Sequence, residues 1–189
     1  ADAPARRSAQ NALFHITQSF LRLMAPFLSF TAEEAWKIFA HNTSSKDTIF
    51  TEEFYQLPEI SSAETLIKKW AQIRQMRSDI TKAIENEREA GKVGSSLQAE
   101  IHIVASPADA ALLQSLGDDL RFITITSSAT VEAKDGVTDI LVSVKSSDHE
   151  KCGRCWHHTA DVGANAEHPE LCGRCISNLF GDGDHRLFA

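Results

Sequence analysis

The feature that most constrains this sequence is its set of four cysteines, all of which lie in the last 38 residues. They form two Cys-Gly-Arg-Cys pairs, Cys152 with Cys155 and Cys172 with Cys175, and sixteen residues separate the pairs. Two residues between paired cysteines allow a tight turn to direct both thiolates at one metal ion, and two such turns complete the tetrahedral shell that Zn²⁺ prefers. The pattern therefore predicts one structural zinc ion per chain, held by four cysteines.

Zinc is also expected to determine the fold of this segment. Residues 150–189 contain few aliphatic side chains, so metal binding and folding should be one event. Glycine in each pair is expected to accept a positive φ and to turn backbone amides toward the sulfurs, where the neighbouring arginines also offset thiolate charge. A catalytic zinc would need an open coordination position, which four cysteines do not leave.

Two other uses of the cysteines remain open at this stage. They could form two disulfides or a thioredoxin-like redox pair, but a cytoplasmic compartment keeps thiols reduced and no βαβ pattern surrounds either pair. Three histidines between the pairs could replace a cysteine as zinc ligand: His157, His158 and His168.

Composition and charge narrow the class of protein. The chain has 189 residues, 42% of them hydrophobic, and a formal net charge of -7, which argues against a non-specific polyanion binder. No stretch approaches the roughly 18 apolar residues of a membrane helix, so we expect a soluble, cytoplasmic protein with no membrane partner. The chain does not begin with methionine, which we interpret as processing or as part of a longer protein.

Three helices are predicted in the first half of the chain. From Ser8 to Leu28, apolar residues recur every three or four positions and mark one stripe of an amphipathic helix: Leu13, Ile16, Phe20, Leu23, Met24 and Phe27. Thr31 and Glu34 form a capping-box pattern that predicts the start of a short helix. Residues 41–47 are expected to be a polar loop, and a second long helix is expected from Ser61 to about Ala90, where Gly91 ends it.

The second long helix is the part of the chain with a cationic character. Residues 61–100 carry a net charge of +1, whereas the segments 1–60, 101–149 and 150–189 each carry a net negative charge. The cations that we predict to contact an RNA backbone are Lys68, Lys69, Arg74, Arg77, Lys82, Arg88 and Lys92. The alternative is a solvated helix face in which these cations pair with nearby glutamates.

Beyond Gly94 the pattern changes to that of a small α+β unit. Alternating apolar residues predict a strand through 97–103, a helix is expected at 108–120, and further strands are expected at 122–126, 130–133 and 140–144. Asp135-Gly136 is interpreted as the turn between the last two strands.

Trp156 directly follows the first cysteine pair and has Arg154 beside it, with Arg174 in the second pair. An exposed indole next to guanidinium groups would provide a stacking surface for an unpaired base. The alternative is that Trp156 fills the interior of the zinc module against Leu171 or Ile176.

These motifs together resemble the C-terminal end of bacterial isoleucyl-tRNA synthetase, a class I aminoacyl-tRNA synthetase. The resemblance rests on Cys-Gly-Arg-Cys-Trp-His-His from residue 152, on the segment 167–175 around the second pair, and on 181–189. It extends upstream to 27–36 and to 70–97, which are similar to the helical anticodon-binding domain that isoleucyl, valyl and leucyl enzymes share.

The resemblance implies a mainly α protein with an α+β part: a helical anticodon-binding portion (1–96), a small α+β linker unit (97–149) and a four-cysteine zinc finger (150–189). It implies binding of isoleucine tRNA by a monomer that works with the rest of the synthetase. The His-Ile-Gly-His-type and Lys-Met-Ser-Lys-Ser-type signatures are absent from the sequence, so no catalytic residue is assigned, and ATP and Mg²⁺ would belong to a catalytic domain outside it.

Another class of protein remains as an alternative. The four-cysteine finger also resembles the one that ends some DNA glycosylases, which would make the chain an autonomous zinc-finger nucleic-acid-binding protein. That resemblance explains only the last forty residues or so.

Overall fold

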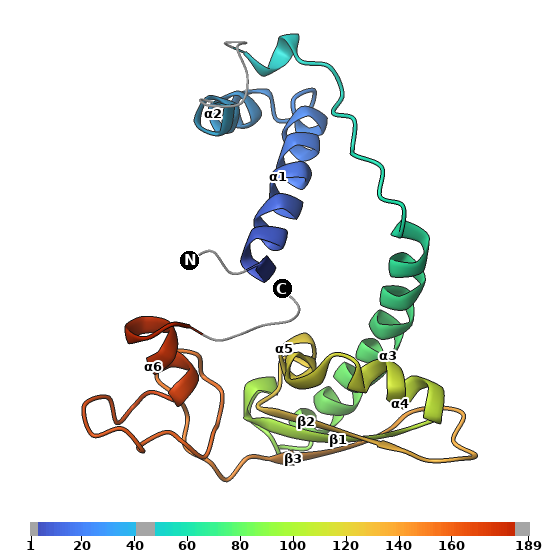
Figure 1. Ribbon diagram of the computed structural model, residues 1–189, viewed down its shortest axis with the longest axis vertical. Helices are drawn as coiled ribbons and strands as arrows, with labels where there is room; N and C mark the ends of the chain where they lie inside the picture. The colour runs from blue at the N-terminus through green and yellow to red at the C-terminus, as the bar shows by residue number, and fades with distance from the viewer. Residues whose placement is uncertain (1–3, 41–47, 184–189) are drawn as a thin grey trace. The chain divides into compact units, whose positions relative to one another are not determined.

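The computed structural model describes residues 4–40 and 48–183, and internal contacts divide the chain into two compact units (Figure 1). Unit 1 comprises residues 1–63 and unit 2 comprises 64–188. The predicted loop 41–47 and the end of the last motif, 184–189, lie outside the described residues. The predicted domain boundaries at 96 and 149 differ from this division and stay a prediction.

Unit 1 contains helix α1 (Pro4–Met24), helix α2 (Ser29–Phe39) and the short 3-10 helix η2 (Ile49–Thr51). Its core forms where small residues allow the helices to approach each other closely: the buried side chains are Leu21, Ala25, Ala32, Trp36, Ala40 and Ile49. The predicted capping box is wrong, because α2 begins at Ser29 and Thr31 lies within it.

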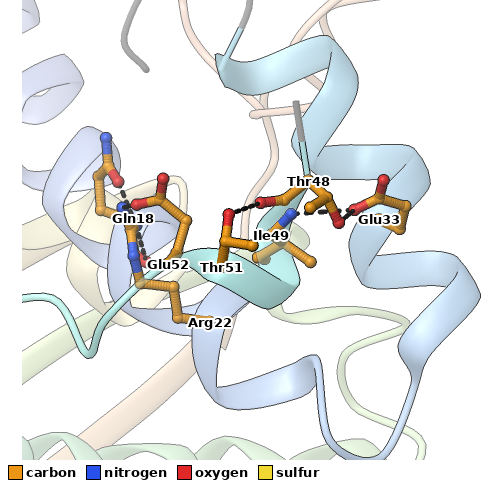
Figure 2. Close-up of polar contacts among 7 residues, drawn as sticks. All are labelled: Gln18, Arg22, Glu33, Thr48, Ile49, Thr51 and Glu52. Carbon is orange, nitrogen blue, oxygen red and sulfur yellow. Dashed lines mark hydrogen bonds and ion pairs between the residues drawn. The ribbon is translucent and has the colours of Figure 1, made fainter. Parts of the chain in front are cut away.

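Two charged side chains attach residues 48–52 to the helices of unit 1 (Figure 2). The Arg22 guanidinium on α1 forms an ion pair of 2.5 Å with Glu52 and stacks over the Trp36 ring at 4.6 Å. On α2, a Glu33 carboxylate oxygen accepts hydrogen bonds of 3.0 Å from the Thr48 hydroxyl and the Ile49 amide. The Ile49 amide is the main cause that lowers the pKa of Glu33, since it stabilises the ionised carboxylate.

Most of the predicted apolar stripe of α1 does not pack against α2; of its members within the helix, only Met24 packs, partly buried, against the unit 1 core. Leu13, Ile16, Phe20 and Leu23 are between 55% and 61% exposed, whereas Leu21 and Ala25 are 7% exposed. The periodicity correctly indicated a helix, but it did not identify the face that α2 covers. The small residues of α2 meet the Leu21 side of α1, and the rest of the stripe is left open within the described residues.

Unit 2 begins with the long helix α3 (Ala63–Glu89), in which Ile73, Met76, Ile80 and Ile84 are buried. Gly91, at φ +72°, ends the helix as predicted. The Gly91 amide donates to the Arg88 carbonyl and the Lys92 amide donates to the Glu87 carbonyl, which is the hydrogen-bond pattern of a Schellman cap.

A three-stranded sheet follows, built from β1 (Ala99–Ala105), β2 (Ser128–Ala133) and β3 (Leu141–Ser146). Strand β1 lies in the middle, parallel to β2 and antiparallel to β3. Its alternate residues Ile101 and Ile103 are buried against α3 and against the helices α4 (Pro107–Gln114) and α5 (Leu120–Thr124). The sheet and these three helices therefore share one apolar core.

The predicted strand at 122–126 is wrong, because α5 occupies 120–124. The β-branched residues Ile123 to Thr126 favour a strand locally, but burial of Leu120 in the shared core overrides that preference. Ile125 adopts the left-handed conformation (φ 58°) and ends the helix. The predicted helix 108–120 is similarly interrupted, with Gly117 at φ +56° leading into the 3-10 helix η4 (Gly117–Asp119).

Asp135-Gly136 forms a turn between the last two strands, as predicted. Strands β2 and β3 lie on opposite sides of β1, so the segment between them crosses an end of the sheet. The remaining elements are the 3-10 helix η3 (Ser96–Gln98) and helix α6 (Gly173–Phe180). The predicted fold class, mainly α with a small α+β part, is confirmed, and no described helix is long and apolar enough to cross a membrane.

Replacing Ile80 with Ala should lower the free energy of unfolding of unit 2 by about 2–5 kcal/mol, because the side chain is 1% exposed in the shared core. Ile67→Ala on the same helix is the control: Ile67 is 63% exposed, and its loss should cost no more than about 0.5 kcal/mol. Chemical denaturation measures both, and equal effects would contradict the proposed core.

Candidate metal centre and nucleic-acid interface

The four cysteines form one cluster. Their sulfur atoms all lie within 4.8 Å of one another, and the Cys155 and Cys172 sulfurs are 3.7 Å apart. Zinc–sulfur bonds of about 2.3 Å in a tetrahedron place sulfurs about 3.8 Å apart, so the cluster has the size of a zinc site. The four predicted ligands thus form one cluster, whose size is that of a site for one structural zinc ion.

The two pairs reach this cluster from different local structures. Cys152 and Cys155 lie in a turn that the Trp156 amide closes with a hydrogen bond of 2.9 Å to the Cys152 carbonyl. Cys172 caps the start of α6 and Cys175 lies one turn into that helix. The second pair is thus held by helical geometry, and the first by a loop.

The expected role of glycine in the two pairs is only partly correct. Neither Gly153 nor Gly173 has a positive φ; the left-handed residue of the first turn is Trp156, at φ 66°. Gly173 has a different constraint, since a Cβ there would lie 2.8 Å from an Asp161 carboxylate oxygen, which would have to move. That oxygen accepts a hydrogen bond of 2.7 Å from the Gly173 amide and ties the intervening loop to the start of α6.

Hydrogen bonds to sulfur give the thiols different acidities. Burial raises the pKa of the Cys152 thiol, but the backbone amides of Cys155, Cys172 and Arg154 outweigh it and lower that pKa to about 6. Burial raises the pKa of Cys172 to about 12. The Arg154 guanidinium lies 3.6 Å from the Cys175 sulfur, so this predicted RNA-binding residue also offsets charge at the metal centre.

The histidines near the cluster have other contacts. The His157 ring is 8% exposed and packs edge-on against Phe122 at 5.4 Å, and burial followed by the nearby Arg121 charge lowers its pKa. His158 contacts the His149 carbonyl at 2.8 Å, and His168 stacks on Phe180 at 4.2 Å. Among the described residues, no histidine belongs to the group of ligands.

Trp156 lies at the surface of the zinc module. Its side chain is 57% exposed, and the Lys151 ammonium is 5.2 Å from its ring. The apolar side chains that pack on the cysteines are Val162 and Leu171. Trp156 is therefore not the interior filling of the module, and stacking on RNA stays the prediction for this residue.

Sequence reasoning missed an aromatic residue that joins the zinc module to α5. The Phe122 ring lies 4.8 Å from the Arg174 guanidinium and 4.5 Å from that of Arg121, in addition to its contact with His157. The sequence pattern placed Phe122 in a strand, so its contacts with the zinc module were not predicted. Arg174 thus has a structural contact in addition to its predicted RNA contact.

A second joint lies beside the sheet. The His158 amide donates to the Ser127 hydroxyl at 2.6 Å, and that hydroxyl donates to the Leu97 carbonyl at 2.5 Å. These contacts and Phe122 attach the zinc module to the α+β part of unit 2.

The seven predicted cations, six on α3 and Lys92 just after it, fall into two groups. Four have partners in the structure: Lys69 donates to Ser115 (3.2 Å), Arg77 to the Ile123 carbonyl (2.6 Å), Arg88 pairs with Glu85 (2.8 Å) and Lys92 with Glu87 (2.6 Å). Lys68, Arg74 and Lys82 are exposed and make no ion pair or hydrogen bond within the part of the chain that the structure describes. At 100° per residue, these three face away from the buried isoleucines.

Comparison with known proteins places this geometry in a family. A profile described as the anticodon-binding domain of tRNA ligase matches residues 1–103, and one described as the zinc finger found in FPG and IleRS matches residues 150–178. The chain belongs to the anticodon-binding family of tRNA ligases. An anticodon-binding domain implies a tRNA partner.

The relatives are similar to the chain along its whole length. Isoleucine–tRNA ligase of Cupriavidus pinatubonensis is 58% identical over 189 residues, and that of Cupriavidus taiwanensis is 56% identical over 188; each match covers 100% of this chain. The ligase of Burkholderia cenocepacia is 55% identical over 189 residues. The chain spans about a fifth of the length of these relatives (20%).

Removal of zinc is expected to unfold the zinc module, because few apolar side chains other than the cysteines are buried there. Cys172→Ser should abolish stoichiometric zinc binding, whereas His168→Ala should retain one zinc per chain. Affinity should fall as the pH is lowered, since the thiols must lose protons to bind metal. Metal analysis at several pH values, with circular dichroism after chelation, measures these effects; retained zinc in Cys172→Ser would contradict the ligand set.

Proposed function

We propose that this chain is the tRNA-recognising part of an isoleucyl-tRNA synthetase and that it binds the anticodon region of isoleucine tRNA. The observation that carries the proposal is the similarity to isoleucine–tRNA ligases over the whole chain, combined with an exposed tryptophan and cations beside a zinc site. In this role the chain supports ATP-dependent charging of the tRNA by a catalytic domain that these residues do not contain.

Lys68, Arg74 and Lys82 are proposed to hold RNA phosphates. A free ammonium or guanidinium group gains more from a phosphate than one that already contacts a carboxylate, because the paired group must first give up its partner. Lys69, Arg77, Arg88 and Lys92, which were also predicted to bind RNA, are proposed to contribute less. The acidic remainder of the chain favours a local contact over non-specific RNA binding.

The zinc module is proposed to meet the unpaired bases of the anticodon loop. Single-stranded bases are recognised by stacking on aromatic rings and guanidinium planes, and Trp156 offers an exposed ring with Lys151 beside it. Arg154 and Arg174 lie next to cysteine ligands, so zinc would fix their positions relative to Trp156. The metal would act by positioning these side chains, with no part in chemistry.

We propose a cytoplasmic, monomeric protein whose ATP and Mg²⁺ sites lie in the portion of a synthetase outside these residues. No catalytic residue is proposed in this chain, because its sequence lacks the adenylation signatures.

The alternative is an autonomous zinc-finger nucleic-acid-binding protein. The observation that favours this alternative is the zinc-finger profile, because it is described as found in FPG as well as in IleRS. Competition between duplex DNA and isoleucine tRNA for the zinc-loaded chain separates the two functions. Preference for duplex DNA would overturn the proposal.

Replacing Lys68, Arg74 and Lys82 together with Ala should weaken tRNA binding and reduce the slope of log affinity against log salt by about 2–3, since each phosphate contact contributes about 0.7–0.9. Arg88→Ala with Lys92→Ala is the control, because both residues already have glutamate partners. Filter binding at a series of salt concentrations measures the slopes. Equal slopes for the two variants would contradict the assignment.

Trp156→Ala should cost about 1–3 kcal/mol of binding free energy for an anticodon stem-loop, which is the usual contribution of one base stacked on an aromatic ring. Because the side chain is exposed, zinc content and thermal stability should stay unchanged. Phe30→Ala, which removes an aromatic ring that is 93% exposed in unit 1, is the control for loss of aromatic surface. A loss of stability without a loss of affinity would point to a structural role of Trp156.

A further inference from the structure

Helix α1 has two apolar faces, and the residues that the structure describes cover only one of them. Leu21 and Ala25 are buried against α2, whereas Leu13, Ile16, Phe20 and Leu23 are 61%, 59%, 58% and 55% exposed. At 100° per residue the four exposed side chains fall within an arc of about 80°, whose centre lies about 120° around the helix from Leu21. A helix that is apolar on two sides is typical of a position between two packed layers.

The spacing of the exposed residues indicates the shape of what covers them. Leu13, Ile16, Phe20 and Leu23 follow each other at intervals of three, four and three. This is the spacing of the a and d positions that interlock with another helix. The partner surface is therefore expected to be helical and apolar.

The charges of α1 are inconsistent with a face that remains in water. Between residues 8 and 24, Arg22 is the only Lys, Arg, Asp or Glu, and its guanidinium pairs with Glu52. A solvated helix face normally carries charged side chains, and none lies on this one. RNA is not the expected occupant either, because the stretch from Leu13 to Leu23 offers a phosphate no cation except the paired Arg22, and Arg6 and Arg7 lie in the first turn of the helix.

We propose that this face of α1, defined by Leu13, Ile16, Phe20 and Leu23, docks against an apolar helix in the part of a synthetase that lies outside the matched fifth. The inference rests on the proposed place of the chain in such an enzyme. About four fifths of each relative lies outside the match and can provide such a helix. A second copy of this chain is a less favourable partner, because both copies would carry a net charge of -7 and repel each other. The contact fixes the anticodon-binding part to the body of the enzyme.

The test compares two proteins by hydroxyl-radical footprinting without RNA: the 189-residue chain, and a full-length ligase in which it replaces the matched fifth of the Cupriavidus pinatubonensis relative. Oxidation of Leu13, Phe20 and Leu23 should fall about five-fold in the full-length protein, since the core of an interface excludes water. Trp156 is the internal reference, because its exposed fraction of 57% is close to that of the face. Unchanged oxidation of the three side chains would overturn the proposal.

Two further measurements identify other occupants. Light scattering of the 189-residue chain should show a monomer, and a dimer with these side chains protected would assign the face to a second copy and overturn the proposal. Protection that appears only when tRNA is added would assign it to RNA, with the same consequence. Failure of the 189-residue chain to bind tRNA would instead count against the proposed function and leave the footprint unaffected.

A variant separates docking from folding. Phe20→Ser with Leu23→Ser should leave the helicity of the 189-residue chain unchanged, because both side chains are exposed there. In the full-length protein the same change should lower the melting temperature and restore oxidation of Leu13. Asn11→Ser, an exposed position of α1 outside this face, should do neither. Equal behaviour of the two variants in the full-length protein would contradict the docking.

Discussion

The shared apolar core between α3 and the sheet is the constraint on which unit 2 depends. Isoleucines 73, 80 and 84 of α3 meet Ile101 and Ile103 of the central strand, and all five are at most 2% exposed. Helices α4 and α5 complete this core, so α5 presents Phe122 and Arg121 at a fixed place. The zinc module then attaches to α5 through Phe122 and to the segment before β2 through Ser127.

The two parts of unit 2 are stabilised by different interactions. The core of α3, α4, α5 and the sheet is stabilised by burial of apolar surface, which the cysteine-rich tail is too short to achieve by itself. The tail relies on zinc–thiolate bonds, and on Arg154 and backbone amides that offset the thiolate charge. In the proposed function, zinc bound by the four cysteines would hold the exposed Trp156 at a defined position on this core, where it could stack on an unpaired base.

Features that depend on residues close together in the sequence were predicted correctly, whereas a feature that depends on residues far apart was not. The cysteine cluster was predictable because each pair is a local turn and the tetrahedral shell requires both. The end of α3 at Gly91 was predictable for the same reason, since one residue with positive φ satisfies the last carbonyls. The strand predicted at Phe122 failed, because local β preference was outweighed by burial of Leu120 in a core formed by residues far away in the chain.

The sequence by itself therefore determined the four-cysteine cluster, the long helices α1 and α3 and the family resemblance, all of which follow from spacing along the chain. Only the tertiary structure decided which cations of α3 are already paired, that β1 lies between β2 and β3, and which face of α1 meets α2. The physical reason is that spacing specifies which residues share a face of one element. It does not specify what lies opposite that face, and partner choice is set by packing between elements distant in sequence.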